Sequence, residues 1–289
     1  MIDYHIHPNY SSDARGTIDE FCQSALKNGL KEICFTTHLD SDLTRDDAYV
    51  MVDDKKVDVQ SNDWLVHYES SVRQADETYR KQGLRVKLGI EVDYYPGIRE
   101  NLPDQFFDTD FDVILGSVHL FDHHAISVEK ESHKVFQKYT LSQLGERYYG
   151  YLINCVDTEL FDILAHIDLY RRYGEQYYGK EIFNIWKPHI EQLSDAMRTK
   201  KVAFEVNTSS WRKNLTDPMP TGSLIKSLIA RGIDIITIGS DAHYPEMIGN
   251  GIQRVLTYLQ EIGVETVSTY EKRTPQKIPI ESLIQQQEK

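Results

Sequence analysis

Histidines and carboxylates recur along this chain at the ends of short apolar segments, where a folded protein can bring them together. The first segment ends in His5-Ile6-His7, and the last is followed by Asp241-Ala242-His243. Alternate residues of a strand point to the same side, so His5 and His7 can bind one ion. Imidazole nitrogens and carboxylate oxygens without thiolates suit zinc, manganese or iron(II), and the mixture does not select one of them. These residues predict a cluster of divalent metal ions that supports hydrolysis.

The other candidate ligands lie at or near the ends of the intervening segments. They are Asp13, in the loop after the first segment, and His38, Glu91, His119 and His166, with Glu205 and Asn207 at the end of the sixth segment. A lone histidine at a strand end usually makes only hydrogen bonds. Polar groups at seven strand ends, however, need a common partner, because an unsatisfied buried polar group is costly. A metal cluster is such a partner.

Five histidines remain outside this set: His67, His123, His124, His133 and His189. They fall in helical or polar loop segments, and we expect them to have structural roles. Two of them, His123 and His124, are close enough to His119 in sequence to line the rim of a site. Asp3 is expected to orient the first strand or a ligand histidine.

Seven apolar segments, rich in β-branched residues, are predicted to be the strands that position these side chains. They cover residues 1–6, 32–37, 86–92, 111–118, 161–167, 201–206 and 233–240. Helical segments alternate with most of them, and one helix is expected from about Ile18, with Thr17 and Glu20 as a capping box and Gly29 at its end. This alternation predicts an α/β fold with a parallel sheet. In a parallel barrel the carboxyl ends of all strands meet on one face, so the candidate ligands would converge there.

Composition limits the other possibilities. The net charge of −13 opposes binding to nucleic acid, and no apolar run reaches the roughly 20 residues that span a membrane. The three cysteines, Cys22, Cys34 and Cys155, form no C-x-x-C pair, and the N-terminus does not resemble a signal peptide, so we expect a cytoplasmic protein. No dinucleotide-binding or Walker A motif occurs.

We expect one domain over residues 1–289. The acidic connection from Leu39 to Asn62 is expected to be a solvated loop or, alternatively, a lid that favours a cationic substrate.

Several motifs occur together in one order along most of the chain. They are His5-x-His7, Asp13, Thr37-His38, Gly89-Ile90-Glu91, Gly116-Ser117-Val118-His119, Ala165-His166 and Gly239-Ser240-Asp241-Ala242-His243. This set resembles the polymerase and histidinol phosphatase (PHP) superfamily, and Glu205-Val206-Asn207-Thr208 and the segment 166–174 are most similar to its histidinol-phosphate phosphatase branch. The resemblance implies a distorted seven-stranded (β/α)7 TIM-like barrel that binds up to three divalent metal ions (zinc, manganese or iron).

The resemblance also assigns roles to individual residues. It implies one ion bound by His5, His7, Glu91 and Asp241, a second that shares Glu91 and adds His119 and His166, and a third at Asp13, His38 and His243. Arg172 matches a family position that binds substrate phosphate. Two positions depart from the wider superfamily: Asp13 replaces a histidine of some members, and Ser209 stands where an arginine is often found, so Arg212 is expected to supply that charge.

The function implied is hydrolysis of a small phosphorylated substrate, L-histidinol phosphate, to L-histidinol and phosphate in histidine biosynthesis. No catalytic side chain is expected beyond a metal-bound hydroxide, which metal ions can supply near neutral pH. One alternative is a PHP-type phosphoesterase that acts on nucleotides or phosphotyrosine. Others are a barrel amidohydrolase, which would often bridge its metals with a modified lysine, and a non-catalytic metal-binding module. The oligomeric state is left open.

Overall fold

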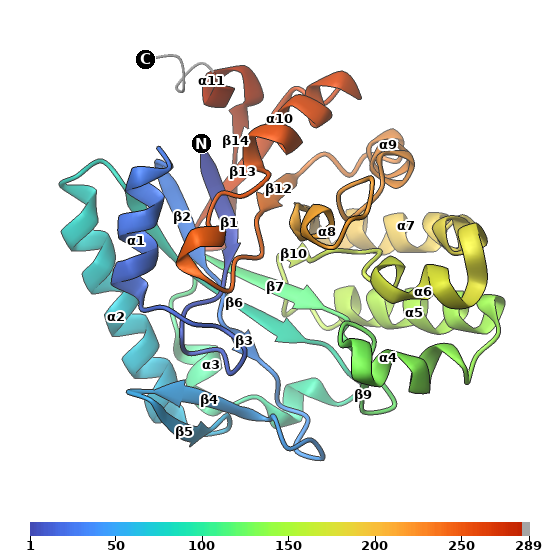
Figure 1. Cartoon of the computed structure of the whole chain (residues 1–289), viewed down its shortest axis with the longest axis horizontal. Helices are drawn as coiled ribbons and strands as arrows, with labels where there is room; N and C mark the ends of the chain where they lie inside the picture. Colours follow the sequence, from blue (N-terminus) through green and yellow to red (C-terminus); the bar gives the residue numbers. More distant parts are fainter. Residues whose placement is uncertain (285–289) are drawn as a thin grey trace.

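Seven parallel strands form the centre of the computed structural model, which describes residues 1–284 (Figure 1). In sheet order they are β1 (Ile2–Ile6), β2 (Glu32–Phe35), β6 (Arg85–Asp93), β7 (Val113–Ser117), β10 (Ile163–Leu164), β11 (Ala203–Asn207) and β12 (Ile236–Gly239). A short strand, β3 (His38–Leu39), also pairs with β6 in parallel. A parallel bridge between Ile6 and Ala242 joins the first strand to the segment directly after β12. The predicted seven-stranded α/β barrel is therefore confirmed in a nearly closed form.

Helices follow most of the strands and flank the barrel on both sides of the view in Figure 1. The longer ones are α1 (Ile18–Lys27), α2 (Asn62–Arg80), α5 (Leu141–Asp157), α7 (Ile190–Lys200), α9 (Gly222–Ala230) and α10 (Ile252–Glu261). The shorter ones are η1 (Ile98–Asn101), α3 (Asp104–Asp108), α4 (Glu129–Phe136), α6 (Arg171–Tyr178), η2 (Gly179–Asn184), α8 (Ser209–Arg212), η3 (Pro245–Met247) and α11 (Ile280–Ile284). Among the described residues, no helix combines the length and the apolar character that crossing a membrane requires.

Local sequence signals explain where these helices begin and end. Thr17 and Glu20 form the predicted capping box at the start of α1, in which each side chain accepts a hydrogen bond from the other residue's backbone N–H. The helix ends before Gly29, which adopts a positive φ of 72° that glycine tolerates without steric cost. A second capping box, at Thr140 and Gln143, begins α5.

The acidic connection from Leu39 to Asn62 differs from the prediction. It contains a hairpin, β4 (Tyr49–Val52) with β5 (Lys55–Asp58), and its residues Leu39, Val50 and Val59 are fully buried. This connection, expected to be a solvated loop, therefore contributes residues to the core. Its apolar residues are few and widely spaced, so they produce no strand periodicity in the sequence.

Two further hairpins complete the fold. The small one, β8 (Leu120–Phe121) with β9 (His124–Ala125), lies directly after the carboxyl end of β7. The larger one, β13 (Thr266–Glu271) with β14 (Thr274–Pro279), lies near the N-terminus in Figure 1 and was not predicted. It is anchored to the barrel because Tyr270 donates its backbone N–H to the Tyr4 hydroxyl at 2.9 Å. This hairpin lies at the amino ends of the strands and leaves the opposite face free for a site.

Candidate metal centre

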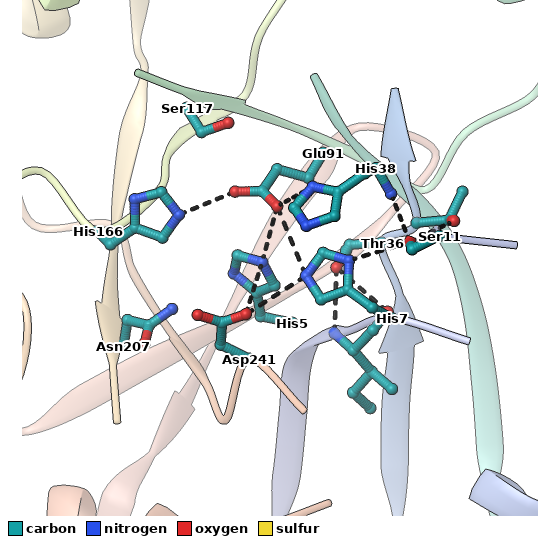
Figure 2. Close-up of polar contacts among 12 residues, drawn as sticks. His5, His7, Ser11, Thr36, His38, Glu91, Ser117, His166, Asn207 and Asp241 are labelled. Carbon is teal, nitrogen blue, oxygen red and sulfur yellow. Dashed lines mark hydrogen bonds and ion pairs between the residues drawn. The ribbon is translucent and has the colours of Figure 1, made fainter. Parts of the chain in front are cut away.

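Glu91, near the end of β6, lies at the centre of a cluster of histidines (Figure 2). Its side chain is fully buried. The shortest distances from its carboxylate oxygens to imidazole nitrogens are 2.9 Å for His166, 3.0 Å for His38, 3.2 Å for His5, 3.5 Å for His7 and 3.6 Å for His119. Oε1 faces His119 and His166, whereas Oε2 faces the other three histidines. One carboxylate can therefore connect two groups of imidazoles.

A second carboxylate, Asp241, follows β12 and closes the cluster from the other edge of the barrel. Its Oδ1 lies 3.4 Å from His7 Nε2 and 3.5 Å from His243 Nδ1. Nε2 of His243 is in turn 3.3 Å from Oδ2 of Asp13, and the same oxygen is 4.0 Å from His38 Nε2. Side chains that follow the first and the last strand of the barrel thus meet at this point.

Potential ligand atoms form four compact groups in the described part of the chain. Within each group the atoms lie within 4.8 Å of one another; the groups are His5–His7–Asp241, His5–Glu91–His166, His7–His38–His243 and His38–Asp40–His119. Three of them join residues that the sequence assigned to the metal cluster. The fourth adds Asp40, which the sequence did not assign as a ligand.

Glu205 orients two of the histidines from β11. Its Oε1 lies 2.7 Å from Nδ1 of His5, which places the ring proton on Nδ1 and leaves Nε2 free to bind a metal. Its Oε2 accepts hydrogen bonds from the His166 backbone N–H at 3.0 Å and from the Asn207 side-chain amide at 3.1 Å. Asp3, expected to orient the first strand, accepts hydrogen bonds from the backbone of Ser240 and Gly249 at 2.8 and 2.9 Å. It therefore holds the loop after β12.

The electrostatics of the cluster fit a divalent cation. Burial alone would raise the pKa of Glu91, but the imidazoles of His5, His38 and His119 hold it well below its usual value. Burial would likewise lower the pKa of His5, but Glu205 and Glu91 raise it well above its usual value. Burial lowers the pKa of His119 to about 3, which keeps that imidazole neutral. The negative charges of Glu205 and Glu91, which favour a proton on His5, also attract a metal ion. Metal binding requires ionised carboxylates and neutral imidazoles.

Unpartnered nitrogens support the same interpretation. Nε2 of His7 and Nδ1 of His38 are buried and have no hydrogen-bond partner, although both face Glu91 Oε2. Buried polar atoms are normally satisfied, and exceptions need an explanation such as an ion. The donor set of nitrogens and oxygens without sulfur suits zinc, manganese or iron.

Backbone strain occurs at two of these positions. His166 and Asp241 have positive φ angles of 26° and 56°, which residues other than glycine rarely adopt. Such strain concentrates at functional sites, where the surrounding structure maintains it. Here it turns each side chain into the cluster directly after a strand ends.

A cavity of about 390 Å³ opens above the cluster. Arg172 and Arg212 line it, and both contact Asp241: Nη2 of Arg172 is 3.9 Å from Oδ2, and Nη2 of Arg212 donates to the backbone oxygen at 2.7 Å. Nε of Arg172 and Nη1 of Arg212 are buried without hydrogen-bond partners. These two guanidinium groups can therefore still donate hydrogen bonds to a bound anion.

The structure brings all the predicted site residues to this one place. Nine of the eleven line the cavity, namely Asp13, His38, Glu91, His119, His166, Arg172, Arg212, Asp241 and His243, and the buried His5 and His7 contact them from below. Of the histidines expected to be structural, His67 contacts the Tyr10 hydroxyl at 2.6 Å and His189 stacks on Tyr149. Neither His123 nor His124 lines the cavity.

Three carboxylates at the cavity, Asp40, Asp47 and Asp93, were missed as site residues. Asp40 and Asp47 were assigned only to the acidic connection, and Asp93 was not singled out. The sequence signal for Asp40 and Asp93 was their position two residues after a predicted ligand, His38 or Glu91, which favours the same side of an extended segment.

The geometry can be compared with known proteins. The model of the PHP domain matches residues 3–209, which is more than half of the chain. This chain belongs to the PHP domain family. A probable histidinol-phosphatase from Deinococcus radiodurans is 26% identical over 273 residues, which cover 93% of this chain and 96% of the relative. A histidinol-phosphatase from Lactococcus lactis is 25% identical, with 93% and 94% covered.

Solved structures show the same fold in this PHP-domain protein's relatives. Histidinol phosphate phosphatase from Lactococcus lactis, crystallised with zinc, L-histidinol and phosphate, superposes with a TM-score of 0.77 at 22% identity, over 96% of this chain and 98% of the other. A histidinol phosphatase structure from Listeria monocytogenes gives a TM-score of 0.71 at 15% identity, with 88% and 99% covered. The barrel is thus shared along nearly the whole of each chain.

Proposed function

We propose that this protein is a metal-dependent phosphomonoesterase that hydrolyses L-histidinol phosphate to L-histidinol and phosphate. One observation carries the proposal: the histidine and carboxylate cluster around Glu91 and the two arginines at Asp241 share one cavity. A metal cluster beside free guanidinium donors is what a phosphate monoester requires. Relatives named histidinol-phosphatase over more than nine-tenths of this chain support the choice of substrate.

We propose as metal ligands the nine residues that the sequence suggested: His5, His7, Asp13, His38, Glu91, His119, His166, Asp241 and His243. Bound divalent ions would lower the pKa of water and neutralise phosphate oxygens. Up to three ions fit the proposal, because the candidate ligands surround both oxygens of Glu91 and continue to Asp13. Zinc is the ion in the crystallised Lactococcus lactis enzyme and is our first candidate.

The chain's own residues then bind and orient the substrate. Arg172 and Arg212 donate hydrogen bonds to the phosphoryl oxygens and hold the phosphorus atom next to the cluster, since phosphoryl transfer depends mainly on positioning and charge stabilisation. Ser209 helps to place Arg172, whose Nη2 lies 3.4 Å from the serine Oγ. Glu205 keeps His5 in one tautomer throughout.

The size and charge of the site favour a small substrate. A cavity of about 390 Å³ fits a compact molecule, and the net charge of −13 disfavours a long nucleic acid. We also propose that the strands of residues 2–239 and the elements attached to them form one domain. Residues 285–289 of the predicted range 1–289 lie outside the described residues.

Phosphate release tests the proposal. Protein reconstituted with zinc, manganese or iron is incubated with L-histidinol phosphate, nucleoside monophosphates, phosphotyrosine or p-nitrophenyl phosphate. We expect kcat/KM for L-histidinol phosphate to exceed the others by at least about a hundredfold, because specific contacts to the organic part add to those with phosphate. Equal rates on all substrates, or a preference for nucleotides or phosphotyrosine, would reject the assigned substrate, and no hydrolysis at all would reject the enzyme.

A further inference from the structure

Most carboxylates that line the cavity have a partner in the protein. Glu91, Asp241 and Asp13 face the histidines of the metal cluster. Asp47 accepts two hydrogen bonds from Arg45, at 2.6 and 2.7 Å, and is thereby neutralised. The charges of these four acidic groups are thus directed at histidines or at Arg45.

Asp93 and Asp40 also adjoin histidines, but each has one buried carboxylate oxygen without a partner. Asp93 is 1% exposed; its Oδ1 accepts the backbone N–H of His119 at 2.7 Å, and its buried Oδ2 has no partner. Oδ1 of Asp40 is also buried without a hydrogen-bond partner, and the described residues offer this carboxylate no lysine or arginine. Both side chains line the cavity. An unpartnered acceptor in a cavity wall costs free energy that a bound donor recovers.

The two carboxylates also lie on neighbouring segments. Strand β3 pairs with β6 in parallel, with His38 opposite Glu91 and Leu39 opposite Val92, so Asp40 and Asp93 are the next residues on the two segments. Both line the cavity, and one cation can therefore reach both carboxylates. Arg45, which also lines the cavity, is paired with Asp47 and Glu131 instead.

We propose that Asp40 and Asp93 form a subsite that binds the protonated amino group of an amino-alcohol phosphate. The choice of L-histidinol phosphate as that molecule rests on the proposed function. A ligand oxygen of Asp40 lies within 4.8 Å of ring nitrogens of His38 and His119, at the edge of the proposed metal centre. In an amino-alcohol phosphate, four bonds separate the nitrogen from phosphorus, a span of at most about 5 Å. A phosphoryl group at the metals therefore brings the ammonium group to this wall.

The position of the arginines agrees with this division of the cavity. Arg172 and Arg212 contact Asp241, whereas Asp40 and Asp93 adjoin His38 and His119. The anionic and cationic parts of one small molecule can thus each contact groups of opposite charge in separate parts of the site. Such complementarity selects a zwitterionic phosphate over a simple alkyl phosphate.

Binding measurements test the subsite without turnover. The probes are 3-aminopropylphosphonate, which keeps the four-bond spacing, and propylphosphonate, which lacks the amine; both are titrated by calorimetry into zinc-loaded protein. We expect the amine to bind ten- to a hundredfold more tightly to the wild type. This preference should fall below about threefold in Asp40→Asn and in Asp93→Asn, whose amide oxygen can still accept the His119 N–H. Asp46→Asn, an exposed change in the same loop, should retain the full preference.

Three results would overturn the inference. The first is equal affinity of the wild type for the two phosphonates. The second is an amine preference that survives Asp40→Asn. The third is loss of about one zinc ion per chain in Asp40→Asn, measured by mass spectrometry, which would make Asp40 a metal ligand with His38 and His119. Failure of the proposed function looks different: no phosphate release from L-histidinol phosphate, with the amine preference and its loss in both variants intact.

Discussion

Replacing Glu91 by glutamine tests the metal centre most directly. The change keeps the shape of the side chain but removes its charge and turns one ligand oxygen into an N–H donor. Because Oε1 faces two histidines and Oε2 faces three others, loss of either oxygen removes a ligand from one group and weakens the other. Even groups that only support a metal ligand are typically worth about 10–100-fold in metal affinity or activity. Two affected groups then predict a loss of about 10²–10⁴.

We therefore expect Glu91→Gln to lose at least one metal ion per chain and to lower kcat/KM for L-histidinol phosphate about 1000-fold. This factor corresponds to about 4 kcal/mol of transition-state stabilisation, at about 1.4 kcal/mol for each factor of ten. The assay measures metal content by mass spectrometry and phosphate release after chelation, reloading with zinc and dialysis. The free energy of unfolding of the metal-free proteins is measured in parallel, so that a folding defect is recognised.

Two matched variants serve as controls. Glu159→Gln makes the same chemical change at an exposed ion pair with Lys200, and His189→Ala removes a histidine that stacks on Tyr149 outside the cavity. Both should keep the metal content and turnover of the wild type. If Glu91→Gln instead retained full metal content and activity within tenfold of the wild type, or if His189→Ala lost its metal, the assignment of the centre would be wrong.

Three further predictions concern binding, metals and pH. Arg172→Ala should raise KM for L-histidinol phosphate and lower kcat/KM about 10–100-fold with unchanged metal content, since it removes charge-assisted hydrogen bonds to phosphate; loss of metal instead would contradict this role. Chelation should lower the melting temperature by about 5–10 °C, because a tightly bound ion adds about 3 kcal/mol to the free energy of unfolding. An unchanged melting curve would argue against a buried cluster. Arg45 lowers the pKa of Glu131 to about 2, so this stabilisation is present above about pH 4.5 and is lost as the pH falls through about 2. Glu131→Gln should therefore destabilise the protein by about 1–2 kcal/mol at pH 7 and by almost nothing near pH 2, as followed by denaturant unfolding; a difference independent of pH would contradict the ion pair.

Much of the fold could be predicted because its signals are local. The strands of the barrel are short and apolar on both faces, and Thr17 with Glu20 marks the start of α1 through contacts three residues apart. The hairpin of residues 266–279 was missed because β14 is mostly exposed and polar, so no apolar alternation indicates it. The buried Val50 and Val59 were missed for a similar reason, since isolated apolar residues in an acidic connection form no pattern.

The sequence by itself determined which residue types could bind metal and that they stand at strand ends. Parallel strands bring their carboxyl ends to one face, so order along the chain was sufficient to predict the convergence of His5 with His243. Only the tertiary structure decided which histidines each oxygen of Glu91 faces, and that Glu205 sets the tautomer of His5. It alone showed that Asp40 and Asp93 each have one buried carboxylate oxygen without a hydrogen-bond partner. The physical reason is that hydrogen bonding and desolvation depend on neighbours far apart in sequence, whose distances are set when the barrel closes.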